Sequence, residues 1–210
     1  MNRLRIALTK GRLQDNSLKL FERAGLDCSA VNEGGRKLIH EMKNYPMDIV
    51  LAKAPDVITY VEHGVCDLGI VGKDTIMEKG GAFYEVLDLG FGMCHFALAV
   101  LENESESFFD GFKTRCIATK YPAVAARYFE QKGMDVTIIK IEGSVELAPI
   151  LGLADAIVDI VETGETLRQN GLKPIENVHS VSARLIVNTA AMKLYKSQIE
   201  DFIKKCEANK

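Results

Sequence analysis

The sequence predicts an α/β protein with mainly parallel sheets. Short runs of aliphatic and β-branched residues alternate with helical patterns along most of the 210 residues, and this alternation is typical of parallel sheets covered by helices. Apolar residues make up 47% of the chain and charged residues 26%, which is a globular composition. The length corresponds to one large or two small domains.

Eight segments are predicted to be strands because they are apolar and lie between turn-forming residues. The clearest is 156–161, a continuous apolar run that only Asp159 interrupts. In chain order the predicted strands are 5–9, 47–52, 67–72, 85–89, 94–101, 115–119, 136–141 and 156–161.

Six segments are predicted to be helices, with residues 14–24, 55–62, 74–79, 122–132, 145–151 and 190–207. Pro55 and Pro122 stand at first helical positions, where the missing N–H costs nothing, and Gly133 is a typical residue after a helix end. The last helix has the strongest pattern, because one apolar stripe runs along it: Tyr195, Ile199, Phe202, Ile203 and Cys206.

Composition and charge argue against several classes of protein. A formal net charge of −3 provides no basic surface for a phosphate backbone, which argues against nucleic acid as a partner. The longest stretch without a charged residue, 89–101, has 13 residues, whereas a membrane-spanning helix needs about 20. The apolar run after the N-terminus is also too short for a signal peptide. Five cysteines lie far apart and form no C-x-x-C pair, so we expect free thiols in the cytoplasm.

The common nucleotide-binding motifs are incomplete. Gly72-Lys73-Asp74 resembles the end of a P-loop, but Asp67 stands where the first glycine belongs and Asp74 replaces the hydroxyl residue that would hold magnesium. No G-x-G-x-x-G follows a predicted strand. The sequence therefore argues against both of these motifs.

The segment 142–167 carries the strongest chemical signal. Asp155 and Asp159 accompany its apolar strand, and the run 163–166, Thr-Gly-Glu-Thr, then opens a helix. A glycine between hydroxyl residues at a helix N-terminus offers N–H groups, hydroxyl donors and a favourable dipole, which together can hold a phosphate. The upstream carboxylates can accept hydrogen bonds from sugar hydroxyls or bind a magnesium ion.

A purely structural interpretation competes with this one. In it, Thr163 only caps a helix and Asp155 only caps a turn. Asp159 favours a functional site, because burying a carboxylate in an apolar strand without a partner is energetically costly.

The same segment resembles the signature of the ATP phosphoribosyltransferase family. The matching positions are Glu146, Gly152, Ala154, Ile157, Asp159, Thr163, Gly164, Thr166 and Leu167. Further segments agree with this family in the same order along the chain: 10–13 (KGRL), 56–62, 67–74 (DLGIVGKD), 88–92 (DLGFG), 118–122 (ATKYP) and 182–188 (SARLIVN).

The resemblance implies a two-lobed fold like that of a type II periplasmic binding protein, with the active site in a central cleft. Lobe I would comprise residues 1–90 and 179–210. Lobe II would comprise 91–178 and carry the loop that binds phosphoribosyl pyrophosphate. The polar run 102–107, after a long predicted strand, fits a chain that has already crossed into the second lobe.

The resemblance also implies a reaction, in which the 5-phosphoribosyl group moves from phosphoribosyl pyrophosphate to N1 of ATP and diphosphate leaves. This is the first step of L-histidine biosynthesis. Positive charge develops on the ribose and negative charge on the diphosphate, so fixed cations and magnesium matter more than a strong base. We expect Mg²⁺ to enter with the diphosphate and assign no metal ligand on the protein.

By this resemblance the substrate-binding residues include the 5-phosphate loop, Thr163, Gly164, Glu165 and Thr166, together with Glu142, Arg36 and Lys53. The expected catalytic residues are Lys10, Arg12, Asp155 and Asp159, with the two aspartates near the ribose hydroxyls and the cations near the polyphosphates. Lys53 departs from the arginine of many family members; it keeps the charge but loses the bidentate fork. Each cation could equally be an ordinary solvated surface residue.

The chain resembles the short form of the family, which works with a second subunit similar to a histidyl-tRNA synthetase catalytic domain. We therefore expect a hetero-oligomer, specifically a hetero-octamer, with feedback inhibition in the partner subunit. Two other functions remain open: a non-catalytic small-ligand-binding module of the same fold, and a transferase for a different phosphoribosyl acceptor.

Overall fold

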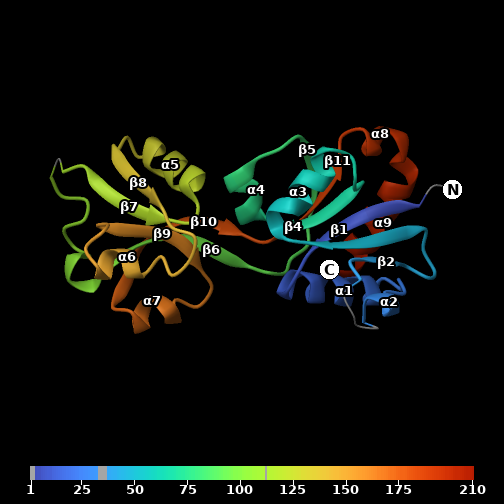
Figure 1. Cartoon of the computed structure of the whole chain (residues 1–210), viewed down its shortest axis with the longest axis horizontal. Coiled ribbons are helices and arrows are strands. Elements are labelled where there is room, and N and C mark those ends of the chain that lie inside the picture. The colour runs from blue at the N-terminus through green and yellow to red at the C-terminus, as the bar shows by residue number, and fades with distance from the viewer. Residues whose placement is uncertain (1–2, 33–36, 112) are drawn as a thin grey trace. The chain divides into compact units, whose positions relative to one another are not determined.

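The computed structural model describes residues 3–32, 37–111 and 113–210. The chain forms two compact units: unit 1 is Met1–Gly92 with Ser182–Lys210, and unit 2 is Met93–Val181 (Figure 1). The sequence predicted boundaries after residues 90 and 178. The second one lies later in the structure because strand β10, Leu172–Val181, belongs entirely to unit 2.

Unit 1 contains one six-stranded sheet, in the order β2-β3-β1-β4-β11-β5. Its strands are β1 (Leu4–Thr9), β2 (Ile39–Glu41), β3 (Met47–Ala52), β4 (Leu68–Gly72), β5 (Phe83–Asp88) and β11 (Ala183–Asn188). The central strands β3, β1 and β4 are parallel, and the other pairs are antiparallel. Strand β11, which returns from beyond unit 2, lies between β4 and β5.

Helices cover both faces of this sheet. They are α1 (Arg12–Arg23), α2 (Ser29–Asn32), α3 (Ala54–Glu62), α4 (Lys73–Lys79), α8 (Ala191–Leu194) and α9 (Lys196–Asn209). Alternate residues of β1 belong to different cores, because successive strand side chains point to opposite faces. Leu8 packs with Phe21 of α1 and Phe202 of α9, whose rings meet edge to face at 5.5 Å. Ala7 packs on the other face with Val57 of α3.

Gly69 allows α3 to lie close to the sheet. A Cβ atom at this position would come within 2.8 Å of methyl groups of Val57 and Val61. Any side chain at position 69 would push α3 away from the sheet. Close packing of the helix therefore explains the glycine in the DLGIVG run.

Unit 2 contains a five-stranded sheet in the order β10-β6-β9-β7-β8. The remaining strands are β6 (Cys94–Leu101), β7 (Arg115–Thr119), β8 (Val136–Lys140) and β9 (Ala156–Val161), and the helical segments are η1 (Glu102–Glu104), α5 (Pro122–Gln131), α6 (Leu147–Ile150) and α7 (Glu165–Gln169). Figure 1 shows α5 on one side of this sheet and α6 and α7 on the other. Strands β9, β7 and β8 are parallel, so their carboxyl ends lie at one edge.

The structure confirms the α/β class but corrects two details. Both sheets are mixed rather than mainly parallel, because β5, β6, β10 and β11 pair in antiparallel fashion. The predicted helix 190–207 is divided at Tyr195, whose φ of −123° and ψ of 29° leave the helical region. Its buried stripe remains, since Ile199, Phe202 and Cys206 are inaccessible to solvent.

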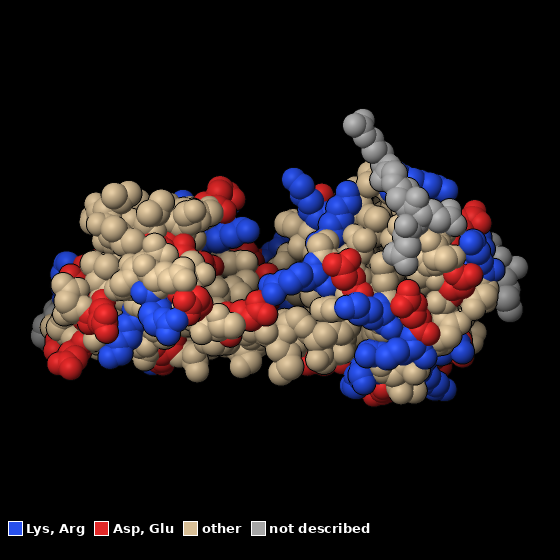
Figure 2. Space-filling model, turned by 90° about the horizontal axis from the view of Figure 1, so that it is seen from below, with Lys and Arg blue, Asp and Glu red and all other residues tan. Residues whose placement is uncertain are grey.

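Basic and acidic side chains are intermingled on the face drawn in Figure 2. Among the described residues, no helix is both long and apolar enough to span a membrane.

Candidate functional site

The predicted phosphate loop follows the carboxyl end of β9. Gly164 has a left-handed backbone (φ 75°, ψ 3°) and forms the N-cap of α7, so the chain turns sharply between strand and helix. Thr163, Glu165 and Thr166 are exposed, whereas the next residue, Leu167, is buried in the unit 2 core. The buried Leu167 side chain thus anchors the loop to the unit 2 core, and the loop presents its polar groups to solvent.

Thr163 is not the cap that the structural interpretation required. Its hydroxyl accepts only a long hydrogen bond, 3.4 Å, from the Glu165 N–H, and Gly164 occupies the cap position. The first-turn N–H groups of a helix have no acceptor within the helix, so they can serve a bound anion.

Asp159 lies in β9, two residues before the end of the strand at Val161 and on the same face as Ile157 and Val161, which are buried in the unit 2 core. Its Oδ1 atom accepts a 2.8 Å hydrogen bond from the N–H of Ile160. Burial raises the pKa of Asp159 above its ordinary value; the Ile160 N–H opposes this effect, and the charge of Glu146 adds to it. A half-buried carboxylate held at a strand end is unusual for a structural residue and suits a polar ligand.

Glu142 follows β8 at the same edge of the sheet. Its carboxylate forms a 2.8 Å ion pair with Lys140, and both side chains are exposed. This hydrogen bond, with the positive charges of Lys140 and Lys120, lowers the pKa of Glu142. The structure therefore brings Glu142, Asp159 and the 163–166 loop to the edge where the parallel strands of unit 2 end.

Asp155 lies at the opposite end of β9. Four strand residues span roughly 13 Å at about 3.3 Å each, so its carboxylate is distant from the loop. It accepts hydrogen bonds from Lys113 Nζ (2.6 Å) and from the Cys116 N–H of β7 (2.7 Å), and Arg115 lies 3.8 Å away. Burial alone would raise the pKa of Asp155, but these donors outweigh it and the pKa is lowered. These contacts tie β9 to β7. Because Asp155 and Asp159 stand at opposite ends of β9, the structure separates the two predicted ribose residues.

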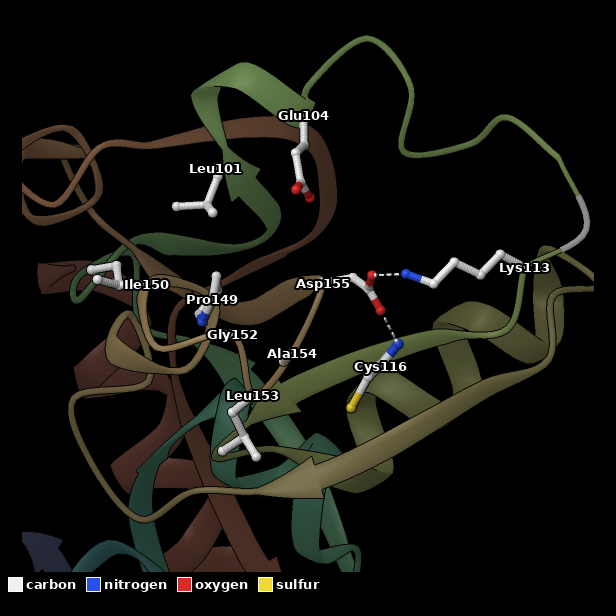
Figure 3. A pocket seen from close by; sticks show the side chains of 10 residues that line it. All are labelled: Leu101, Glu104, Lys113, Cys116, Pro149, Ile150, Gly152, Leu153, Ala154 and Asp155. Carbon is white, nitrogen blue, oxygen red and sulfur yellow. Dashed lines mark hydrogen bonds and ion pairs between the residues drawn. The ribbon is translucent and has the colours of Figure 1, made fainter.

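A cavity of about 430 Å³ opens beside Asp155 (Figure 3). Leu101, Ile150 and Leu153 contribute apolar side chains to its lining, and Glu104, Lys113 and Asp155 contribute charged ones. The 163–166 loop contributes nothing to its lining. The cavity therefore includes Asp155 among the predicted site residues but lies apart from the predicted phosphate loop.

Two predicted cations of unit 1 lie next to each other. Lys10 follows β1 and Lys53 follows β3, and these strands pair in parallel with Thr9 opposite Ala52. The Lys10 N–H donates a 2.9 Å hydrogen bond to the Ala52 carbonyl, which fixes the two strand ends together. Both side chains are exposed, as is Arg12 at the start of α1. Arg36 lies outside the described residues.

Two further lysines at strand ends were not among the predicted site residues, although both lie in segments that match the family. Lys73 follows β4, the other parallel neighbour of β1, and pairs with Glu85 at 2.5 Å. Lys120 follows β7 at the unit 2 edge described above. The available signal was a lysine directly after a predicted parallel strand, a position where functional side chains gather in α/β folds.

The residues of 3–32, 37–111 and 113–210 include no group of three His, Cys, Asp or Glu side chains arranged to hold a metal ion. Magnesium in enzymes of phosphorylated substrates is commonly held by one or two carboxylates together with substrate phosphates.

Comparison with known proteins gives a consistent result. The family model described as ATP phosphoribosyltransferase (HisG) matches residues 53–208. The curated ATP phosphoribosyltransferase of Clostridium kluyveri is 60% identical over 98% of this chain and 93% of its own length. That of Bacillus cereus is 54% identical over 99% of this chain and 97% of its own.

Two solved structures are similar to the chain. The ATP phosphoribosyl transferase (HisG:HisZ) complex from Thermotoga maritima includes a chain with a TM-score of 0.82 and 31% identity, covering 98% of this chain and 97% of that one. The alkanesulfonate-binding protein SsuA from Xanthomonas axonopodis has a TM-score of 0.57 and 14% identity, covering 100% of this chain and 73% of that one. The second similarity concerns the fold alone, and it supports the two-lobed, type II periplasmic-binding-protein-like architecture.

Proposed function

Because the chain belongs to the ATP phosphoribosyltransferase family, we propose that it transfers the 5-phosphoribosyl group of phosphoribosyl pyrophosphate to N1 of ATP, as the first step of L-histidine biosynthesis. One observation carries the proposal: a half-buried carboxylate, Asp159, and an exposed hydroxyl-lined turn at Gly164 share the carboxyl end of β9. A phosphorylated sugar needs such a pair, an anion site for its phosphate and an acceptor for its hydroxyls.

In this proposal the 163–166 loop binds the 5-phosphate. The first-turn N–H groups of α7 and the hydroxyls of Thr163 and Thr166 donate to the phosphate oxygens. The Asp159 carboxylate accepts hydrogen bonds from ribose hydroxyls. The proposal assigns the ribose contacts to Asp159, because Asp155 lies at the opposite end of β9, where its carboxylate accepts hydrogen bonds from Lys113 and the Cys116 N–H.

The reaction needs little proton transfer. N1 of adenine attacks C1 of the ribose, the C1–N1 bond forms, and the C1–O bond to diphosphate breaks with its electron pair. Lys10, Arg12, Arg36 and Lys53 are the proposed cations of unit 1 that bind polyphosphate and stabilise the developing negative charge. Mg²⁺ bound to the diphosphate would neutralise part of that charge, and no protein ligand is assigned to it.

The partner proposed for this chain is a histidyl-tRNA-synthetase-like regulatory subunit, assembled with it into a hetero-octamer. The similar structure from Thermotoga maritima is a complex of two components, HisG and HisZ, and this supports a hetero-oligomer. A cytoplasmic location is part of the same proposal.

The experiment that tests the function combines the chain with its partner subunit, ATP, phosphoribosyl pyrophosphate and Mg²⁺. We expect diphosphate release together with the absorbance of an N1-substituted adenine, and no turnover when Mg²⁺ is chelated. Replacing ATP by other bases tests the acceptor. Binding of either substrate without turnover in the complete mixture would contradict the proposal and favour a binding module.

A further inference from the structure

A group of exposed apolar side chains lies on helix α6 and on the turn that follows it. Four aliphatic residues close together in the chain are about half exposed or more: Leu147 (49%), Ile150 (45%), Leu151 (76%) and Leu153 (50%). Helical residues three and four positions apart share a face, so Leu147 lies beside both Ile150 and Leu151. Contiguous apolar surface of this kind typically marks a site of interaction.

The turn that presents these side chains is firmly held. Gly152 has a left-handed backbone, with a φ of 73°, and its N–H donates a 3.1 Å hydrogen bond to the Pro149 carbonyl. The Leu153 N–H donates a 2.9 Å hydrogen bond to the Ala148 carbonyl. These two bonds form a Schellman motif, which ends the helix in one defined conformation. Because the backbone is already ordered, covering the exposed side chains costs a partner little conformational entropy.

The same turn borders the cavity beside Asp155, whose volume is about 430 Å³. Ile150 and Leu153 line the cavity together with Leu101. In Figure 3 the Glu104 side chain points into this space from η1. The exposed aliphatic residues therefore adjoin a recess that can accept apolar side chains of a partner, as the central pockets of protein interfaces do.

The segment that contributes Glu104 to the cavity is acidic. Between residues 102 and 110 it carries four carboxylates and no lysine or arginine: Glu102, Glu104, Glu106 and Asp110. Among the residues that the structure describes, these four carboxylates form no ion pair. Their negative charge is therefore available to a cation from outside the chain.

The two cations nearest to the cavity are already engaged by a carboxylate. Lys113 Nζ lies 2.6 Å and Arg115 3.8 Å from the Asp155 carboxylate. Arg115 also donates a 2.9 Å hydrogen bond to the Ser107 carbonyl, and its guanidinium lies 5.2 Å from the centroid of the Phe108 ring. Arg115 thus holds the acidic segment in place and leaves its carboxylates uncompensated.

Charge discriminates between two possible occupants of this surface. In a twofold interface a second copy would place the same patch against itself, and the two acidic segments would repel each other. A different protein with apolar side chains flanked by lysine or arginine would complement both the aliphatic residues and the carboxylates. The second kind of occupant is favoured.

We propose that α6 and its turn, together with the acidic segment 102–110, bind the second subunit of the proposed hetero-oligomer, through a segment of that subunit that carries apolar side chains flanked by lysine or arginine. This inference rests on the proposed function for the existence of that subunit. Its tests measure association and not turnover. A mixture that assembles without turnover would therefore contradict the proposed reaction and leave the binding measurements valid.

The first test measures the Kd of the full chain for the second subunit by calorimetry. Leu151→Ser removes the most exposed of the four aliphatic side chains, and we expect about tenfold weaker binding. Leu194→Ser, at the end of α8 in unit 1, is the matched control because Leu194 is 73% exposed, and it should bind like the parent. Thermal unfolding of both variants should stay close to that of the parent, since neither side chain is buried.

Parent affinity in Leu151→Ser, or an equal loss in Leu194→Ser, would overturn the inference. A parent chain that does not bind the second subunit at all would overturn both this inference and the proposed partner.

The second test reverses one charge. In Glu104→Lys we expect binding to the second subunit to weaken by roughly threefold to tenfold at low ionic strength, and by less as salt is raised. Glu130→Lys reverses an exposed charge on α5, which covers the other side of the same sheet (Figure 1), and should leave the Kd unchanged. Tighter binding of Glu104→Lys would show that the occupant is acidic and would overturn the inference.

Sedimentation of the chain alone tests a second copy as the occupant. We expect the parent and Leu151→Ser to have the same oligomeric state when the second subunit is absent. If the parent self-associates and Leu151→Ser abolishes this association, the surface joins two copies of the chain and the inference is overturned.

Discussion

Asp155 and Asp159 accompany the same strand, but only Asp159 shares an end of that strand with the Gly164 turn. The Asp155 carboxylate bonds to the Cys116 N–H at 2.7 Å and joins β9 to β7. The Asp159 carboxylate lies beyond the Ala156–Val158 stretch, and its hydrogen bond within the chain is to its own neighbour, Ile160. One acid therefore joins two strands through its carboxylate, and the other stands at the end of β9 that leads into the Gly164 turn.

Asp159→Ala and Thr166→Ala should each weaken binding of phosphoribosyl pyrophosphate far more than binding of ATP. The first removes the proposed acceptor of the ribose hydroxyls and the second a donor to the phosphate, and each such bond to a charged group contributes about 1.5–3 kcal/mol, or roughly tenfold or more in affinity. Calorimetry with each ligand separately measures the two effects. Thr137→Ala, at an exposed position of β8, is the matched control. Equal losses for both ligands would show that the sugar-phosphate site lies elsewhere.

Asp155→Asn should reduce stability more than it affects substrate binding. Removing the charge leaves Lys113 and the Cys116 N–H with a weaker acceptor, at a cost of about 1–3 kcal/mol. Because the pKa of Asp155 is lowered in the folded state, its stabilisation is present above the pKa of the unfolded chain and is lost as pH falls through the folded value. The difference in free energy of unfolding between the parent and Asp155→Asn should therefore become smaller below about pH 4, the ordinary range for aspartate.

Urea unfolding at about pH 7, pH 4 and pH 3 measures this difference. Glu142→Gln is the control, because it removes an exposed ion pair with Lys140 and should leave the unfolding midpoint close to that of the parent. If the difference in free energy of unfolding stayed constant across this pH range, the ionised carboxylate of Asp155 could not be the cause of that difference.

Gly164→Ala should impair both folding stability and donor binding, whereas Gly133→Ala should impair stability alone. Both glycines have left-handed backbones, with φ of 75° and 66°, and an added Cβ atom meets no close neighbour at either site. The conformational cost of alanine, roughly 1–2 kcal/mol, is thus similar at both. Only Gly164 lies in the loop, so the KM for phosphoribosyl pyrophosphate should rise in that variant and not in the other. A similar KM in both variants would remove the loop from the site.

Lys53→Ala should lower kcat/KM of the phosphoribosyl transfer, and Lys53→Arg should keep most of the parent kcat/KM. The position follows the carboxyl end of β3 beside Lys10, so it contributes positive charge to a pair, and arginine supplies the same charge with a bidentate fork. The effect of Lys53→Ala should weaken as salt is raised, because the side chain is exposed. Steady-state kinetics at low and high ionic strength test this, with the exposed Lys19→Ala of α1 as control. A Lys53→Ala enzyme with parent kinetics would assign the residue to ordinary surface solvation.

The features that sequence reasoning located correctly have strong local causes. The helix predicted at 122–132 is present as α5, Pro122–Gln131, because proline opens it and Gly133, with a φ of 66°, follows its end. Strand 156–161 was evident because both its faces are buried.

The features it missed depend on contacts distant in the chain. Strand β10 is largely exposed and contains Pro174, so it has neither the composition nor the alternation of a buried strand; pairing with β6 forms it. Asp155 was grouped with Asp159 by their spacing and by the family resemblance, and the pairing of β9 with β7 reveals its hydrogen-bond partner on the neighbouring strand.

The position of β11 has a consequence for biosynthesis. Because β11 lies between β4 and β5, the sheet of unit 1 lacks an interior strand until residues 183–188 have left the ribosome. Every strand of unit 2 emerges before then. The sheet at the beginning of the nascent polypeptide can therefore be completed only after all of its middle portion has emerged, which departs from the usual amino-terminal-first order.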